Sequence, residues 1–152
     1  MSDRALSQVD EIATERIITK LLLRYAHAVD RREYDAIAGC YWPDAIDQHA
    51  TFHGNAIEYV SWLREVLPPI AVSTHQFTNI LVDVHSHTEA SSETYCLNVN
   101  VFRGNDDTPD RLTTSLLRYL DRFACRDGEW RISDRRVVTD WSRSETPPPM
   151  VR

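Results

Sequence analysis

Glycine is scarce in this chain, with four glycines among 152 residues. A loop that cradles nucleotide phosphates needs closely spaced glycines, and the sequence has no such loop. It also lacks the Gly-x-Ser-x-Gly elbow and the His-Glu-x-x-His motif. These absences leave little room for a nucleotide-binding loop, and they predict chemistry without a bound cofactor.

Long apolar runs and paired cysteines are missing as well. No stretch approaches the roughly 20 apolar residues of a membrane span, and Met1–Ala5 leads into polar sequence without a signal-peptide pattern. Cys40, Cys96 and Cys125 lie far apart and are odd in number, which is typical of reduced thiols inside the cell. We therefore expect a cytoplasmic protein whose cysteines are buried as small hydrophobes.

Positive charge is in deficit. The net charge of −6 argues against nucleic acid and against an anionic membrane as partners. The hydrophobic content of 42% is ordinary for a soluble globular protein, and 152 residues suffice for one domain with a core. The composition therefore predicts a single soluble domain that binds neither nucleic acid nor membranes.

Helical spacing dominates the first half of the sequence. Ser7 and Asp10 form a capping-box-like start, and apolar residues then keep a period near 3.6 to about Asp30. Further elements are expected here: a helix over 33–40, a turn at Trp42-Pro43-Asp44, a strand over 45–52, and a third helix from Gly54-Asn55 to Pro68-Pro69.

Beyond Pro69 the apolar period changes to 2, which is typical of strands. Asp127-Gly128 favours a type I′ hairpin turn, and residues 104–109 predict a longer mobile loop. Residues 144–149 are Pro-rich and cannot form a regular helix or a central strand. They are expected to be either a disordered end or an extended strap. The predicted strands span 74–84, 89–102, 111–125 and 129–138.

Helices followed by a run of antiparallel strands define an α+β layout. Three helices packed on one strongly curved antiparallel or mixed sheet would enclose a cone-shaped cavity, where a small molecule would bind. We assign residues 1–143 to this single domain and residues 144–152 to a Pro-rich C-terminal tail.

Asp30 ends a row of core-facing side chains spaced four residues apart on the first helix. A carboxylate in apolar surroundings needs a partner, and at a helix C-terminus it is unfavourable by about 0.3–1 kcal/mol. His75 is the predicted partner, because a carboxylate that orients an imidazole makes a general base. The alternatives are neutralisation by Arg31 and Arg32, or a local pair with His27.

Four motifs follow one another along the chain: Tyr25-x4-Asp30, Tyr41-Trp42-Pro43-Asp44-Ala45, His75-x3-Asn79, and Arg126-Asp127-Gly128-Glu129-Trp130-Arg131-Ile132 followed by Arg135. This order resembles the SnoaL-like branch of the NTF2-like superfamily, which includes scytalone dehydratase, bile-acid 7α-dehydratase and hexachlorocyclohexane dehydrochlorinase. The resemblance covers roughly residues 12–141, and it implies the cone-shaped α+β fold.

The resemblance also implies roles for four residues. Asp and His at the matching positions act as a catalytic dyad in those enzymes, which implies that role for Asp30 and His75. Tyr25 maps to a site residue, and its hydroxyl would donate to a substrate oxygen. Arg135 maps to a site arginine that would stabilise an oxyanion, unless a bulge exchanges it with Arg136. Core packing for Tyr25 and a surface charge for Arg135 are the structural alternatives.

Five further residues are candidate substrate contacts: Trp42, Asp47, His49, Phe77 and Asn79. Phe77 and Asn79 alternate onto the face of the predicted base. Asp47 and His49 lie two apart on a strand and share a face, so they form either a second polar patch of the pocket or a rim pair at a subunit contact. Trp42 either packs in the core or stacks on a ligand at the pocket mouth. His85-x-His87 lies in a predicted turn with no third ligand nearby, so no metal site is expected.

Together these residues predict a cofactor-independent lyase, in particular a dehydratase of a small cyclic or aromatic hydroxylated substrate. The same dyad would serve isomerisation, dehydrohalogenation or C–C cleavage. Two non-catalytic alternatives stay open, namely a ligand-binding protein that uses the same cone and an accessory subunit similar to the β-subunits of ring-hydroxylating dioxygenases. The resemblance also implies a homodimer or homotrimer, because another subunit usually covers the open face of the sheet in this fold.

Overall fold

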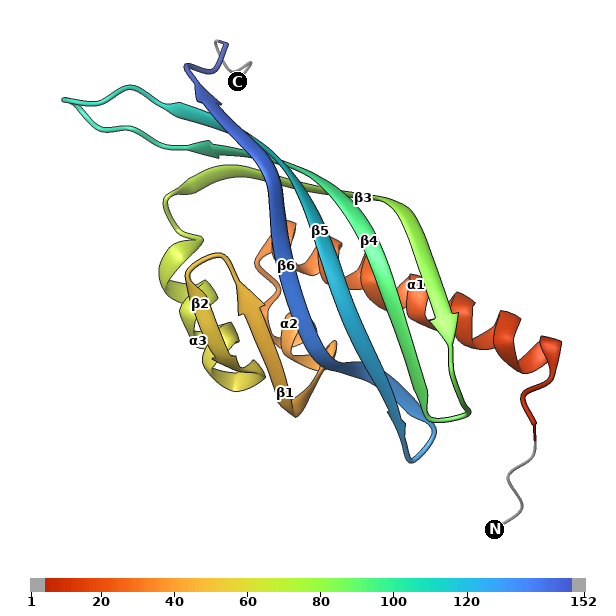
Figure 1. Ribbon diagram of the computed structural model, residues 1–152. Coiled ribbons are helices and arrows are strands. Elements are labelled where there is room, and N and C mark those ends of the chain that lie inside the picture. Colours follow the sequence, from red (N-terminus) through yellow and green to blue (C-terminus); the bar gives the residue numbers. More distant parts are fainter. Residues whose placement is uncertain (1–4, 149–152) are drawn as a thin grey trace.

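Residues 5–148 are described by a computed structural model in which helices pack on one face of a mixed sheet (Figure 1). The strands follow the order β2-β1-β6-β5-β4-β3; β1 and β6 are parallel, and the other neighbours are antiparallel. The α+β cone expected from the sequence is confirmed. The strands are β1 (Tyr41–His49), β2 (Phe52–Asn55), β3 (Ile70–Val84), β4 (Glu89–Phe102), β5 (Arg111–Arg126) and β6 (Glu129–Glu145).

The first helix, α1 (Gln8–Arg31), begins with the predicted capping box. The Ser7 side chain accepts a hydrogen bond from the Asp10 N–H, and the Asp10 carboxylate accepts one from the Ser7 N–H. The helix ends at Arg31 and is capped by Arg32, whose backbone is left-handed with φ of 58°. The predicted apolar stripe packs against the sheet, and α1 lies along β3 and β4 in Figure 1.

Two shorter helices, α2 (Tyr34–Gly39) and α3 (Ala56–Val66), complete the helical layer. Asn55 caps α3 by accepting hydrogen bonds from the N–H groups of Ile57 and Glu58, both at 3.0 Å. The predicted start of this helix at Gly54-Asn55 is confirmed, and Tyr59 on its inner face is fully buried. The cap therefore fixes where Tyr59 enters the core.

The segment after α2 differs from the prediction. Trp42-Pro43-Asp44 is not a turn but part of β1, and the predicted strand over 45–52 is divided by a turn at Ala50, whose φ is 51°. Pro43 is tolerated because the pairing between β1 and β6 is interrupted between Tyr41 and Ile46. No ladder hydrogen bond is therefore required of the proline nitrogen.

The remaining strands follow the predicted pattern with longer ends. β3 starts at Ile70 rather than residue 74, and β6 continues to Glu145, which pairs with Leu112 of β5. Ser144 and Glu145 therefore belong to β6, whereas the part of the tail from residue 149 lies outside the described residues. Asp127-Gly128 forms the predicted turn, with positive φ at both residues (52° and 81°).

The core lies between the helices and the inner face of the sheet. Its fully buried aromatic side chains come from four elements: α1, β1 and β5 supply Tyr25, Tyr41, Tyr119 and Phe123, and α3 supplies Tyr59. Within residues 5–148, no helix combines the length and apolar content needed to cross a membrane.

Candidate active site

A cavity of about 310 Å³ lies between the helices and the inner face of the sheet. Val29 of α1 and Leu63 and Val66 of α3 form its apolar wall. The sheet contributes a polar wall: Ser73, His75, Asn98, Asn100, Ser115 and Thr139. The volume is at the lower end of the roughly 300–1,000 Å³ found for small-molecule sites.

The structure brings Asp30 and His75 into direct contact at this cavity. The Asp30 Oδ1 atom lies 2.7 Å from the His75 Nδ1 atom. The His75 backbone N–H also donates to both carboxylate oxygens, at 3.1 and 3.0 Å, and the Ser73 hydroxyl donates to Oδ1 at 3.2 Å. The C-terminal turn of α1 and the start of β3 thus fix the carboxylate against the ring.

These hydrogen bonds set the charge and the tautomer of the pair. Burial alone would raise the pKa of the Asp30 carboxyl, but hydrogen bonds from the His75 ring and backbone outweigh burial and hold that pKa below its ordinary value. An ionised Asp30 accepts a hydrogen bond from Nδ1–H, so the lone pair of a neutral ring lies on Nε2. Among the described residues Nε2 has no hydrogen-bond partner, and His75 lines the cavity.

Tyr25 lines the cavity from α1 while its ring is buried in the core. Its hydroxyl lies 2.6 Å from the Tyr59 hydroxyl. Burial raises the pKa of Tyr25 to about 12, although the nearby Arg135 charge opposes that rise. The phenol is therefore neutral at physiological pH and available as a hydrogen-bond donor.

Arg135 points into the protein, whereas Arg136 lies on the exposed outer face. Arg135 donates from Nε and Nη2 to the two Asp121 oxygens, both at 2.7 Å, and from Nη1 to the Tyr41 hydroxyl at 3.0 Å. Its guanidinium carbon is 4.2 Å from the centre of the Tyr25 ring. Arg135 is not among the residues that line the cavity. Arg135 lies behind Tyr25, on the side away from the cavity. In this position it is neither a surface charge nor in direct contact with a ligand in the cavity.

Asp47 and His49 form a second polar group, on the β1 side. His49 lines the cavity, and its Nδ1 atom lies 3.2 Å from the Tyr59 hydroxyl and 3.6 Å from Asp47 Oδ1. Asp47 is fully buried behind His49 and accepts a hydrogen bond from the Tyr41 hydroxyl at 2.8 Å. Of this pair, only the imidazole borders the cavity.

Three predicted substrate contacts lie away from the cavity. Trp42 donates from its indole N–H to the Ala124 carbonyl at 2.9 Å, outside the lining residues. Phe77 is partly buried and packs against the core, with its ring centre 4.9 Å from that of Tyr119. Asn79 is exposed with φ of 47°, at an irregularity in the pairing of β3 with β4. This bulge ends the strict alternation that had placed Asn79 on the face of His75.

Sequence reasoning missed the polar residues that lie beside His75. Asn98 of β4 is paired with His75 and with Ser115 of β5, so the three side chains form a row across the inner face. The Asn98 amide donates to the Thr74 carbonyl at 3.3 Å. Side chains along a strand alternate between its two faces. A search for polar residues at the inward-facing positions of the predicted strand would have found Asn98.

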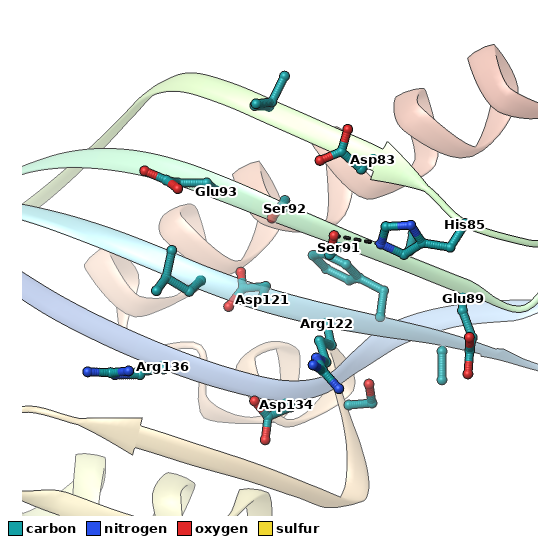
Figure 2. Close-up of a pocket in the computed structure, with 16 residues that line it drawn as sticks. Asp83, His85, Glu89, Ser91, Ser92, Glu93, Asp121, Arg122, Asp134 and Arg136 are labelled. Atoms are coloured by element: carbon teal, nitrogen blue, oxygen red, sulfur yellow. Dashed lines mark hydrogen bonds between the residues drawn. The ribbon is translucent and has the colours of Figure 1, made fainter.

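A second hollow, of about 650 Å³, lies on the opposite face of the sheet, where Figure 2 shows the helices behind the strands. Acidic Asp83, Glu89 and Glu93 lie on or beside β3 and β4, and basic Arg122 and Arg136 lie on β5 and β6. The hydrogen bond drawn there joins His85 Nε2 to the Ser91 hydroxyl at 2.8 Å. Across residues 5–148, no three metal-ligating side chains gather in one place.

Comparison with known proteins agrees with this architecture. A family model described as a SnoaL-like domain matches residues 10–136. The uncharacterized protein Rv2910c of Mycobacterium tuberculosis is 35% identical over 140 residues, which cover 90% of this chain and 92% of that protein. The uncharacterized protein Mb2934c of Mycobacterium bovis matches equally well.

Solved structures share the fold at lower identity. Hexachlorocyclohexane dehydrochlorinase LinA-type3 from Novosphingobium barchaimii superposes with a TM-score of 0.78 at 20% identity, covering 96% of this chain and 99% of that one. A candidate scytalone dehydratase from Novosphingobium aromaticivorans gives the same TM-score and identity, covering 96% and 100%. At this identity the similarity establishes the fold alone. With the family match over most of its length, the chain belongs to the SnoaL-like domain family.

Proposed function

We propose that this protein is a cofactor-independent lyase, in particular a dehydratase that removes water from a small cyclic or aromatic hydroxylated substrate. One observation carries the proposal: His75 Nδ1 lies 2.7 Å from Asp30 Oδ1 while the ring borders a 310 Å³ cavity. A neutral imidazole oriented by a carboxylate is a general base. Structural neighbours named as a dehydrochlorinase and a candidate dehydratase support an elimination reaction.

In this mechanism His75 Nε2 removes a proton from a carbon that a neighbouring carbonyl or ring makes acidic. Asp30 stabilises the imidazolium that forms, and it keeps Nδ1 protonated throughout. The Tyr25 hydroxyl donates to the developing oxyanion or to the departing hydroxide. General-base catalysis contributes about 10²–10⁴-fold and a donor to an oxyanion about 10²–10³-fold. Such factors suit an activated C–H bond.

Arg135 acts through Tyr25 in this proposal. The guanidinium lies against the Tyr25 ring and opposes the rise in the pKa of its hydroxyl that burial causes. It therefore favours negative charge near Tyr25 without touching substrate. Asn98 lies next to His75 and Ser115 lies next to Asn98, so both can orient the polar groups of the ligand. The same arrangement also suits loss of a halide, isomerisation or C–C cleavage, which differ in the leaving group.

The test is an elimination assay with the purified protein on cyclic β-hydroxy ketones, whose conjugated products absorb in the ultraviolet. His75→Ala and Asp30→Asn should each lower the rate by about 10²–10⁴-fold with thermal unfolding close to wild type. His27→Ala is the matched control, because His27 is an exposed histidine on the same helix as Asp30. Loss of folding in both site variants would instead indicate a structural pair.

The same variants distinguish the lyase from a ligand-binding protein without catalytic activity. Binding of the substrate ketone that survives His75→Ala unchanged, together with no turnover by the wild type, would contradict the lyase. Stable co-purification with a larger metalloprotein would favour the accessory-subunit alternative.

The proposal includes a homo-oligomer formed through the outer face of the sheet. Acidic Asp83, Glu89 and Glu93 lie there on β3 and β4, whereas β5 and β6 carry Arg122 and Arg136 together with the acidic Asp134 (Figure 2). Two copies in opposite orientation would bring the acidic strands of one copy against the arginines of the other. Exposed Leu81 and Trp141 add apolar area outside the cone. Light scattering after size exclusion should give two or three times the mass of one chain, and Arg136→Glu should lower it. A monomeric wild type would contradict this part.

A further inference from the structure

The buried charges behind Tyr25 do not cancel without His49. Asp47, Asp121 and Arg135 are each at most 2% exposed. Both oxygens of Asp121 bind the guanidinium, which matches one positive charge with one negative charge. Asp47 Oδ1 has no hydrogen-bond partner within residues 5–148, and His49 Nδ1 lies 3.6 Å from it. Because a buried carboxylate without a counter-charge is costly, the His49 ring is the group placed to balance the charge of Asp47.

His49 is connected to Tyr25 by a short chain of hydrogen bonds. Its Nδ1 atom lies 3.2 Å from the Tyr59 hydroxyl, which lies 2.6 Å from the Tyr25 hydroxyl. All three side chains line the cavity. The chain starts on β1, passes α3 and ends on α1, facing the same cavity as His75.

The two phenols transmit protons without becoming charged. Burial raises the pKa of Tyr25 to about 12 and places that of Tyr59 well above its ordinary range. Neither hydroxyl therefore ionises near neutral pH. Each can accept one proton while it donates another, so a proton that leaves His49 emerges from Tyr25 in a concerted shift.

We propose that His49, held by Asp47, is the proton reservoir of the cavity and supplies Tyr25 through Tyr59. The inference rests on the proposed lyase and adds the acid partner of His75. As His75 takes the substrate proton, the C–H electrons form the new double bond and the C–O electrons leave with hydroxide. Tyr25 gives its proton to the hydroxide, Tyr59 replaces that proton, and His49 replaces the proton of Tyr59. Water leaves, and exchange with solvent returns a proton to His49 and removes one from His75.

Several groups beside His49 influence its proton. Asp47 precedes it on β1, and Tyr59 of α3 stacks on its ring with centres 5.4 Å apart. Further groups pack around the ring from other elements, namely Trp62 of α3, Tyr119 of β5, and the Arg135–Asp121 pair of β6 and β5. Of these charged groups, Asp47 lies 3.6 Å from His49 Nδ1, and its Oδ1 atom has no hydrogen-bond partner within residues 5–148. Asp47→Asn removes this charge and is therefore the variant that tests whether Asp47 holds the proton of His49.

The first experiment needs no substrate. Imidazole ¹⁵N NMR of the full chain, with His49→Gln to assign the signal, should show that His49 keeps its proton to higher pH in wild type than in Asp47→Asn. The downfield proton of the Tyr25–Tyr59 hydrogen bond should shift as His49 titrates, and Tyr59→Phe should abolish it. His53→Gln, an exposed histidine on β2, is the control that changes neither signal. The proposal would be overturned if the signal of the Tyr25–Tyr59 proton did not change as His49 titrates. It would also be overturned if His49 titrated at the same pH in wild type and in Asp47→Asn.

The second experiment compares two leaving groups. A cyclic β-hydroxy ketone and its β-chloro analogue eliminate to the same enone, but chloride departs without a proton. Tyr59→Phe should slow loss of hydroxide about 100-fold, in the range of general acid catalysis, and leave loss of chloride nearly unchanged. His49→Gln should also remove the alkaline limb of the pH–rate profile for the hydroxy ketone. Equal slowing of both substrates would overturn the relay. If neither ketone reacts but the Tyr25–Tyr59 proton still shifts as His49 titrates, the proposed lyase activity is contradicted and the hydrogen-bonded chain from His49 to Tyr25 is not.

Discussion

The imidazoles of two imidazole–carboxylate pairs border the same cavity, and the two pairs differ in burial and in geometry. Asp30 keeps 21% of its side chain exposed and lies 2.7 Å from the His75 ring. Asp47 is fully buried and lies 3.6 Å from the His49 ring. A partly solvated carboxylate in direct contact orients its imidazole at a small desolvation cost, whereas a buried one acts mainly through its charge.

This difference suggests how one residue combination can serve two tasks. A base must take up a proton and release it in each cycle, which suits the solvated pair of Asp30 and His75. A reservoir must hold a proton until it is needed, which suits the buried pair of Asp47 and His49. The carboxylate that has more contact with water should therefore matter most for rate, and the buried one for proton retention.

The largest expected effect is the difference in elimination rate between variants of the two carboxylates, Asp30 and Asp47. Asp30→Asn should slow elimination of a cyclic β-hydroxy ketone by about 10²–10⁴-fold, because the oriented base loses its charge partner. Asp47→Asn should slow it less, because Asp47 lies behind His49 and touches no ligand. Steady-state kinetics on the two variants measures the ratio. Equal losses would remove the distinction between base and reservoir.

The next effect concerns stability and the third buried carboxylate, Asp121. Asp121→Asn leaves the Arg135 guanidinium buried without its counter-charge, and we expect a loss of about 3–5 kcal/mol in the free energy of unfolding. Urea denaturation measures it. Asp140→Asn is the control, since Asp140 forms an exposed pair with Arg118 and should cost little. A similar small loss in both variants would mean that Arg135 finds another partner.

A smaller effect should appear in the pH dependence of stability. The pKa of Asp30 is lower in the folded protein than in the unfolded chain, so the folded state binds this proton less readily. Its stabilising contribution is therefore complete above the unfolded pKa and disappears as pH falls through the folded pKa. Unfolding measured from pH 7 to pH 2 should show a shallower decline in Asp30→Asn than in wild type. A steeper decline would contradict the sign of the shift.

The smallest expected effect concerns the N-terminal caps of α1 and α3, the helices that carry Asp30 and Tyr59. Asn55 caps α3, which holds Tyr59 beside His49, and Ser7 caps α1, which holds Asp30. Asn55→Ala and Ser7→Ala should each cost about 1 kcal/mol in thermal or urea unfolding. Because Ser7 lies at the far end of α1 from Asp30, Ser7→Ala should leave the elimination rate unchanged. A rate loss in Ser7→Ala would mean that the helix moves as a rigid unit.

Sequence periodicity was sufficient for most of the fold. The 3.6-residue spacing before Asp30, the caps at Ser7 and Asn55, and the Asp-Gly turn are local signals, because each depends on residues a few positions apart. The predicted turn at Trp42-Pro43-Asp44 was wrong because the contact that decides this segment is not local. From the sequence alone Pro43 predicts a turn. A strand can contain it because the pairing of β1 with β6 is interrupted there, and that pairing is a contact across the sheet.

The site was only partly predictable. The proximity of Asp30 and His75 followed from an acidic residue that needed a partner, together with the family motifs. The bulge at Asn79 reverses the expected side-chain direction, and nothing in the flanking sequence marks it. Asn98 was missed because its role depends on the register of β4 beside His75.

The sequence by itself determined the helices, the strands and the family, because caps, turns and apolar periods act over short distances along the chain. Only the tertiary structure decided that Arg135 binds Asp121 behind Tyr25 and that His49 reaches Tyr25 through Tyr59. These contacts join side chains that different helices and strands carry. Their geometry is set by strand register and by the need to pair each buried charge.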